Sequence, residues 1–158
     1  MRGIKTFLCL TIFAGTAAFA TPAVSASSII DCGAVSNNIA AQTPAHSTTS
    51  TAFVNLTDGI INFNGGSGNC VIVTVSALVR AKYPQTLRVR ATLDGDVGIQ
   101  PAVDFYTSET AFDGKSATFY FHSVPSGDHI LRIQIRSLNG GTVTMGKGVV
   151  TIFYQPSS

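Results

Sequence analysis

Two histidines and an aspartate stand close together late in the chain: His122, Asp128 and His129. The segment between them, residues 125–127 (Pro-Ser-Gly), is typical of a turn. A turn that pairs Ser123 with Asp128 would place His122 opposite His129, where the two imidazoles and the Asp128 carboxylate could share a metal ion. The alternative is two polar residues at the mouth of a hairpin, because the pattern specifies no further ligand.

Asp94 and Asp96 flank Gly95 and suggest calcium, which takes oxygen ligands from alternate positions of a loop. The further ligands of a calcium loop are absent, and Asp and Gly are equally typical of a tight turn. A glycoside hydrolase would need two facing carboxylates, and no motif selects a pair from the candidates: Asp94, Asp96, Asp104, Glu109 and Asp113.

Established catalytic motifs are absent from the sequence, which contains no GxSxG, HExxH, P-loop or CxxC pattern. We therefore expect a non-catalytic protein without cofactors. A small exported hydrolase, or a metal-binding protein that uses the His122 and His129 region, is the alternative.

Four arginines could form an anion-binding site. Arg88 and Arg90 alternate along one predicted strand, and Arg132 and Arg136 lie on the polar face of another. If these strands are neighbours, the four guanidinium groups would suit sulfated or phosphorylated glycans. Solvated surface arginines are the simpler interpretation. Binding of neutral sugars has less support, because the chain has no Trp to form an exposed aromatic platform.

The N-terminus has the features of a signal peptide. Arg2 and Lys5 precede an apolar stretch at residues 7–20, which is too short to span a bilayer. Small residues follow at the spacing that a signal peptidase reads, so we expect cleavage after Ala26, with Ala20 as an earlier option. The mature protein would then be secreted or periplasmic, with no membrane span.

The mature chain is expected to be electrically neutral. The full sequence has ten Lys and Arg against eight Asp and Glu, and two of the ten, Arg2 and Lys5, leave with the leader. A neutral domain has no general attraction for nucleic acid. Charged residues make up 11% of the chain, against roughly 25% in a typical soluble protein. Such a surface suits extracellular life or assembly.

Two cysteines, Cys32 and Cys70, remain once the leader takes Cys9 away. In an oxidising compartment this even count predicts one disulfide. On the chain-entropy model the bond would stabilise the fold by roughly 4 kcal/mol. It would tether residues 27–51, a Ser/Thr-rich segment that lacks strong apolar periodicity and is expected to be a mobile connection.

Residues 52–158 predict one all-β domain, an antiparallel β-sandwich with a jelly-roll-like pattern of about nine short strands. Apolar and polar residues alternate in residues 86–93, so one face of that strand belongs to the core. Three hairpins are expected, around Asp58 and Gly59, around residues 125–127 and around residues 146–148. No segment after the leader shows a helical period.

Two predicted strands, residues 119–121 and 149–154, are apolar on both faces. A two-layer sandwich covers only one side of each sheet, so something must cover the other. The N-terminal segment or another subunit could do so, and we expect a homo-oligomer or a cell-surface partner. The alternative is a central strand with a few tolerated surface hydrophobic residues.

A resemblance to small secreted bacterial β-sandwich proteins rests on three segments: CVIVTVSA, VRATLDG with Pro101 close behind, and FYFHSVPSGDHILRIQIRSLNGGTVTM. It covers residues 52–154. The pattern is similar to the jelly roll of the C1q and tumour-necrosis-factor group, which implies assembly into trimers. The signal, the cysteine pair and the apolar last strand also resemble chaperone-usher pilins, but Cys70 begins a strand and the chain continues past Tyr154, which departs from the pilin pattern.

Overall fold

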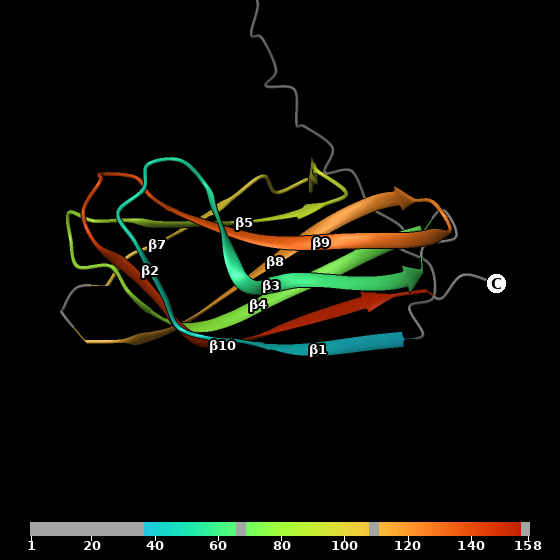
Figure 1. Ribbon diagram of the computed structural model, residues 1–158, viewed down its shortest axis with the longest axis horizontal. Coiled ribbons are helices and arrows are strands. Elements are labelled where there is room, and N and C mark those ends of the chain that lie inside the picture. Colours follow the sequence, from blue (N-terminus) through green and yellow to red (C-terminus); the bar gives the residue numbers. More distant parts are fainter. Residues whose placement is uncertain (1–36, 66–68, 108–110, 156–158) are drawn as a thin grey trace, which may run out of the picture.

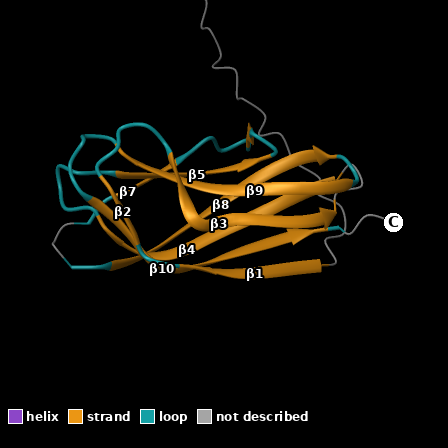
Figure 2. Cartoon of the chain, viewed as in Figure 1, coloured by secondary structure: helices purple, strands orange, loops and turns teal. Residues whose placement is uncertain are grey.

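The computed structural model describes residues 37–65, 69–107 and 111–155. Over these residues the protein is all-β, with ten strands and no helix (Figure 2). The strands form two antiparallel sheets that pack against each other (Figure 1). This confirms the predicted antiparallel β-sandwich.

Each sheet has five strands in this part of the chain. Sheet A has the order β1 (Asn37–Thr43), β10 (Val143–Tyr154), β4 (Asn69–Arg80) and β8 (Asp113–Val124), and β2 (His46–Thr48) also pairs with β10. Sheet B has the order β3 (Val54–Gly65), β9 (Gly127–Ser137), β5 (Leu87–Leu93) and β6 (Asp96–Val97), and β7 (Val103–Phe105) also pairs with β5.

The chain passes from one sheet to the other at most of its connections. From β3 onward the long strands alternate between sheets B and A, so that β3, β5 and β9 lie in one layer and β4, β8 and β10 in the other. The pairing is nested, because β1 pairs with β10, β3 with β9, β4 with β8 and β5 with β7. Strands from the first half of the chain therefore lie beside strands from the second half.

The hydrophobic core lies between the sheets and follows the alternation of each strand. On β9, Leu131, Ile133 and Ile135 are fully buried while the residues between them face outward, and β10 contributes Val150 and Ile152 from the other sheet. Burial of such a side chain contributes about 1.5–3 kcal/mol. A shift of one residue would turn the whole set to solvent, so this alternation fixes each strand's register.

The hairpin predicted around Asp58 and Gly59 is wrong. Both residues lie inside the continuous strand β3, and the register between β3 and β9 shifts between Asn55 and Ile60. The extra residues are absorbed in a bulge, which bends the strand without reversing it. Gly59 packs close to Leu56 and Ile133, which leaves no room for a side chain there.

The hairpin predicted around residues 146–148 is also wrong, because these residues continue β10. The register between β10 and β4 shifts between Met145 and Gly148. A Cβ atom at Gly148 would lie 2.6 Å from the Ser76 carbonyl oxygen. Glycine is therefore required here for the close passage of two strands and not for a turn.

The third predicted hairpin, around residues 125–127, is wrong in its pairing. β8 pairs with β4 in sheet A, whereas β9 pairs with β3 and β5 in sheet B. Ser123 and Gly127 both have positive φ, at 54° and 148°, where the chain leaves one sheet for the other. Ser123 consequently does not pair with Asp128.

The Ser/Thr-rich segment is more ordered than predicted. Its described part contains β1 and β2, which lie along β10, so the sandwich begins before residue 52. Ile39 and Ala41 pack against the core, and the outward residues between them are small or polar. Because its apolar alternation is weak, β1 could not be predicted from the sequence. Pairing with the long strand β10 holds it in place.

Candidate functional site

A continuous patch of uncharged residues lies on the outer face of sheet A. We call it the uncharged face, and it consists of Asn38, Ala40 and Gln42 on β1; Val149, Thr151 and Phe153 on β10; Ile72, Thr74, Ser76 and Leu78 on β4; and Ser116, Thr118 and Tyr120 on β8. Large side chains on it are 37–48% exposed: Leu78, Tyr120, Val149 and Phe153. The two segments predicted to be apolar on both faces, residues 119–121 and 149–154, turn Tyr120, Val149 and Phe153 outward.

Hydroxyl groups on the uncharged face hydrogen-bond to one another across the strands. Thr74 Oγ1 lies 3.1 Å from Thr118 Oγ1, and Ser76 Oγ lies 3.0 Å from Ser116 Oγ. Burying a hydroxyl without a partner costs free energy, whereas these four hydroxyls already have one. Covering the face therefore requires less desolvation than its Ser and Thr content suggests.

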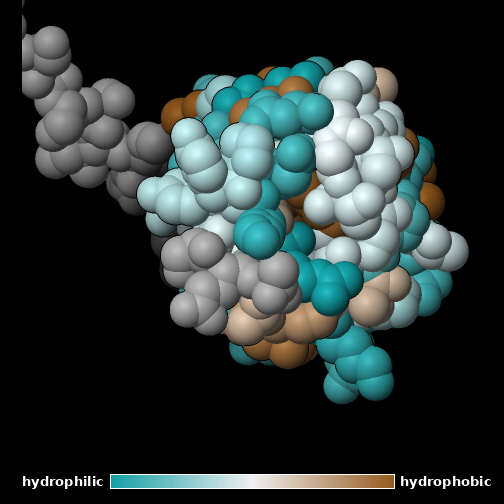
Figure 3. Space-filling view, turned by 90° about the vertical axis from the view of Figure 1, so that its left-hand side faces the viewer, coloured by the Kyte–Doolittle hydropathy of each residue, from teal (hydrophilic) through white to brown (hydrophobic). Residues whose placement is uncertain are grey.

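One end of the sandwich shows where this face stops. Viewed from that end, hydrophobic residues are visible at the lower edge of the molecule and also at its upper left and right edges (Figure 3). Arg80 lies opposite Thr144 near the start of β10, and the exposed Lys147 lies in the bulge of the same strand. These two cations border the uncharged face at this end.

The outer face of sheet B brings together all four predicted arginines: Arg88, Arg90, Arg132 and Arg136. We call it the arginine face. β5 and β9 are neighbours in the sheet, and their register pairs Arg88 with Arg136, Arg90 with Gln134 and Thr92 with Arg132. Like charges directly opposite one another across a strand pair destabilise a sheet unless something compensates for them.

Arg88 has a carboxylate partner. Its Nε lies 2.5 Å from Asp104 Oδ1 and its Nη2 lies 2.6 Å from Asp104 Oδ2, so the contact is bidentate. Asp104 lies on β7, the strand on the far side of β5 from β9. The hydrogen bond to Asp104 raises the pKa of Arg88. Of the four arginines in the predicted anion site, Arg88 is therefore already neutralised by a carboxylate.

Arg90 and Arg136 instead share an aromatic ring. The Arg90 guanidinium carbon lies 3.8 Å from the centre of the Phe53 ring, and that of Arg136 lies 4.7 Å from it. Arg90 Nε also donates to Gln134 Oε1 at 2.6 Å. Partial burial and then the charge of Arg136 lower the pKa of Arg90. Phe53, which the sequence did not single out, thus holds two like charges close together.

His129 is a buried histidine with two hydrogen-bond acceptors. Its side chain is 4% exposed. Nδ1 lies 2.6 Å from Asp94 Oδ2, and Nε2 lies 2.9 Å from the Pro125 carbonyl oxygen. Neither partner can donate a proton, so both ring nitrogens must carry one for both bonds to form, and the arrangement fits an imidazolium.

The pKa values of this pair move in the directions that stabilise two charges. Burial alone would lower the pKa of His129, but the hydrogen bonds to Asp94 and Pro125 and the charge of Asp94 outweigh it and raise that pKa. Burial alone would raise the pKa of Asp94, but hydrogen bonds from His129 and from the Ile130 amide lower it. His129 and Asp94 thus form a clamp between β9 and the β5–β6 turn.

The predicted metal cluster does not assemble. His122 is exposed on β8, while His129 points into the clamp. Asp128 Oδ1 accepts a hydrogen bond from Asn64 Nδ2 at 2.7 Å. Across the described ranges no three His, Cys, Asp or Glu side chains are placed to hold a metal ion. The reason is that β8 and β9 belong to different sheets, which separates the two histidines.

The calcium candidates, Asp94 and Asp96, have different surroundings. Asp94 uses Oδ2 for His129 and Oδ1 for the Ile130 amide, at 2.6 Å and 2.8 Å, so both of its oxygens are already engaged in the turn. Asp94 has a φ of 53° and Gly95 a φ of 100°, which are turn conformations that Asp and Gly tolerate. Asp96 follows as an exposed residue of β6.

The carboxylates considered for a hydrolase are mostly engaged with basic side chains. Asp104 binds Arg88, Asp94 binds His129, and Asp113 lies 2.6 Å from Lys115. Glu109 lies outside the described residues. The structure thus offers no free pair of facing carboxylates among the described members of that set.

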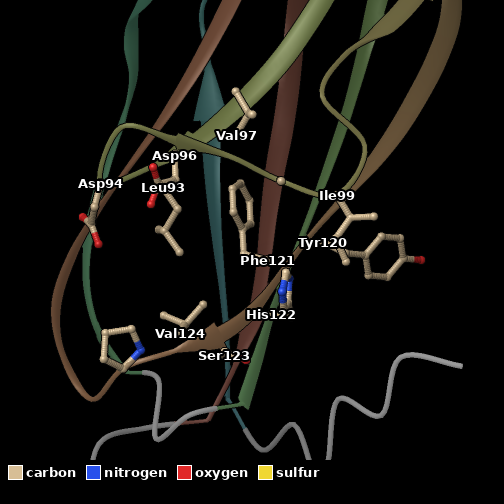
Figure 4. Close-up of a pocket in the computed structure, with 12 residues that line it drawn as sticks. Leu93, Asp94, Asp96, Val97, Ile99, Tyr120, Phe121, His122, Ser123 and Val124 are labelled. Atoms are coloured by element: carbon tan, nitrogen blue, oxygen red, sulfur yellow. The ribbon is translucent and has the colours of Figure 1, made fainter. Parts of the chain in front are cut away.

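A cleft of about 520 Å³ opens beside the clamp, between the β5–β6 turn and the end of β8. Leu93 and Phe121 lie near its centre, Asp94 and Asp96 come from the turn, and His122 comes from β8 (Figure 4). Its apolar floor and scattered polar rim give room for a small molecule. Ser123, which follows His122 in the chain, also lines the cleft, and no hydrogen bond joins these two side chains in the part of the chain that the structure describes.

The predicted disulfide and leader cannot be followed in the structure. Cys70 is buried in β4, and Cys32 and residues 1–26 lie outside the described residues. Within the described ranges no helix is long and apolar enough to cross a membrane.

No protein-family model matches the chain, and no curated protein resembles it at a significant level. The two outer faces, the clamp and the cleft are therefore the features that bear on function.

Proposed function

We propose that the protein is an exported, non-catalytic β-sandwich module that works by contact, and that its first partner is a second copy of itself bound through the uncharged face. The observation that carries the proposal is this face: four strands of outward side chains without a charge, with large hydrophobic residues exposed and hydroxyls already paired. The buried centres of protein interfaces are depleted of charged residues in the same way.

A second copy fits this face better than a charged partner does. An uncharged surface offers no electrostatic complementarity to a foreign protein, whereas two identical apolar patches can meet about a twofold axis. The area of the uncharged face limits how strong the contact between two copies can be. Four strands about 4.8 Å apart and seven residues of about 3.4 Å give roughly 400 Å² in projection, below the roughly 800 Å² per partner of a standard interface. We therefore expect weak, concentration-dependent association.

We assign the sandwich to the jelly-roll type. Support comes from the long strands alternating between sheets and from the nested pairing of β1 with β10, β3 with β9 and β4 with β8. The resemblance to the C1q and tumour-necrosis-factor group agrees with this assignment and favours a closed oligomer over an open chain. A cell-surface partner would then bind to a face that assembly leaves free.

Export and the Cys32–Cys70 disulfide belong to the same proposal. The leader pattern at residues 1–26 supports export to the periplasm or beyond. Cys70 is 2% exposed and lies in β4. A bond to Cys32 would tie the start of the mature chain to β4. Mass spectrometry of the mature protein with and without reduction tests it, and a free Cys32 thiol in the native protein would contradict it.

The self-association is tested with the mature chain by sedimentation velocity from low micromolar to millimolar concentration. Val149→Lys places a charge on the uncharged face, and we expect it to weaken association at least tenfold, because like charges meet across the contact. The matched control is Ile60→Lys, which changes a similarly exposed residue on β3 in sheet B and leaves association unchanged. A wild-type protein that stays monomeric at millimolar concentration would refute the proposal.

A further inference from the structure

The arginine face contains one pair of cations that the protein leaves without a counter-charge. Arg88 is neutralised by Asp104, and the charge of Arg132 acts on Asp94. Arg90 and Arg136 have no acidic partner among the residues that the structure describes. Their contacts are the Phe53 ring, the Gln134 amide and the Thr51 carbonyl oxygen. Two positive charges thus meet at one ring in a partly desolvated setting.

The donors of this pair are also under-used. Each guanidinium has five N–H donors. Arg90 uses Nε for Gln134, and Arg136 makes one long contact of 3.4 Å from Nη1 to the Thr51 carbonyl oxygen. Arg136 Nε is buried and has no acceptor within the described part of the chain. A buried donor without a partner is rare in folded proteins and often marks the place of an absent ion or water.

We propose that Arg90 and Arg136, held by Phe53, bind the tetrahedral oxyanion of a sulfate or phosphate ester. A guanidinium binds such a group through two parallel hydrogen bonds. A tetrahedral ester offers three free oxygens to the two guanidinium groups, whereas a carboxylate offers two. The anion would offset the repulsion between the two guanidinium groups and would accept hydrogen bonds from their unused Nη donors.

The other two arginines of the face act at longer range. Arg88 lies opposite Arg136 in the register, but its guanidinium group is bound to Asp104. Arg132 lies opposite Thr92, nearer the start of β9. Both arginines add to the positive potential of the face, but neither is expected to bind the ester through two parallel hydrogen bonds. This refines the four-arginine site of the sequence to a two-arginine site on Phe53. Because the site lies on the outer face opposite the uncharged face, it is independent of self-association.

A purely structural stack is the competing explanation. The same contacts tie the chain before β3 to sheet B, since Arg136 reaches the Thr51 carbonyl and the Ser137 amide donates to the Ser50 carbonyl oxygen at 2.8 Å. In that case the arginines would hold residues 50–53 in place and bind no anion. The test must therefore include a direct reading of the guanidinium groups.

The experiment uses the mature chain labelled with ¹⁵N and follows the arginine Nε–Hε signals during titration with glucose 6-sulfate, glucose 6-phosphate and glucose. We expect the signals of Arg90 and Arg136 to move with either ester and not with glucose. Arg90→Gln and Arg136→Gln should each weaken binding about tenfold, the usual scale for loss of a charged hydrogen-bond donor. Arg80→Gln is the matched control, because it removes one charge and one aromatic contact elsewhere and should leave affinity unchanged.

The two esters separate the possible sources. Tighter binding of the sulfate points to sulfated glycans, tighter binding of the phosphate points to phosphorylated ones, and equal binding leaves the site selective for the shared oxyanion; each result supports the site. Arg90→Lys is a second variant for the case in which Arg90→Gln does not fold. It keeps the positive charge but cannot make two parallel hydrogen bonds, so it should weaken binding as well. Static Arg90 and Arg136 signals with both esters, or equal losses in Arg80→Gln, would overturn the proposal.

Discussion

The two outer faces of the sandwich arise from the same period-two alternation but satisfy their polar groups in different ways. On the uncharged face the hydroxyls of β4 and β8 pair with one another. On the arginine face one guanidinium takes a carboxylate and two others share the Phe53 ring. A surface whose polar groups are already paired can be covered at little cost, whereas one with spare donors is suited to a polar ligand.

This difference bears directly on assembly. Two uncharged faces can meet without repulsion, but two arginine faces would place several cations against each other. Residues 27–158 carry eight basic and eight acidic side chains, so the asymmetry comes from the distribution of charge and not from its sum. A module of this kind is expected to associate through one face and to keep the other free for a ligand.

The largest expected effect tests whether the two faces are coupled through the clamp, which lies where the chain crosses from β8 in sheet A to β9 in sheet B. Asp94→Asn should lower the free energy of unfolding by about 2 kcal/mol, because the buried His129 loses its charged acceptor. Urea denaturation measures this loss. If the faces are independent, self-association of the folded variant stays unchanged.

The control for this variant is Asp96→Asn, which changes the neighbouring exposed carboxylate. Its effect on stability should lie within about 0.5 kcal/mol, as for other surface substitutions. A loss in Asp96→Asn as large as that in Asp94→Asn would mean that the general charge of the turn, and not the clamp, provides the stabilisation.

A smaller effect is expected from pH, and it separates the faces further. The pKa of His129 is raised in the folded state, so its contribution is fully present below the unfolded value of 6.5 and is lost as pH rises through the folded pKa. The pKa of Asp94 is lowered, so its contribution is present above 3.8 and is lost as pH falls through its folded pKa. The clamp therefore stabilises the fold most between these two limits.

Urea denaturation at a series of pH values should show unfolding free energy falling on the alkaline side of this window. The fall should be smaller than the loss in Asp94→Asn, because neutral His129 keeps one of its two hydrogen bonds. His129→Gln should flatten the alkaline dependence, while His122→Gln, a change at an exposed histidine, should retain it. Self-association should not follow the same curve, since His129 and Asp94 lie outside the uncharged face.

Alternation along single strands was the part of the fold that the sequence predicted well. Residues 86–93 form β5 almost as expected, and the two apolar faces of residues 149–154 are the core face and the uncharged face. These features depend on neighbouring residues and on a period that is visible in one segment. The same local reasoning failed at glycines, because an Asp-Gly or Gly-x-Gly segment is compatible with both a turn and a bulge.

The candidate site was less accessible, because it depends on pairings between distant segments. The sequence identified the arginines of β5 and β9 but could not show that Asp104 neutralises Arg88 or that Phe53 lies between Arg90 and Arg136. His129 was considered as a metal ligand because a turn could have placed His122 opposite it, whereas the crossover between sheets gives it Asp94 as partner. Register across a nested topology is set by the whole core and cannot be read from one hairpin.

The smallest expected effect concerns the uncharged face alone. Replacing both Thr74 and Thr118 by Val removes a hydroxyl pair that the two residues satisfy between themselves, so the free energy of unfolding should change by less than about 0.5 kcal/mol. Thr74→Val alone leaves the Thr118 hydroxyl without its cross-strand partner and should cost more than the double variant. Because the double variant adds two methyl groups to a face that a second copy covers, sedimentation velocity should show tighter association, and weaker association would contradict the assignment of this face to self-contact.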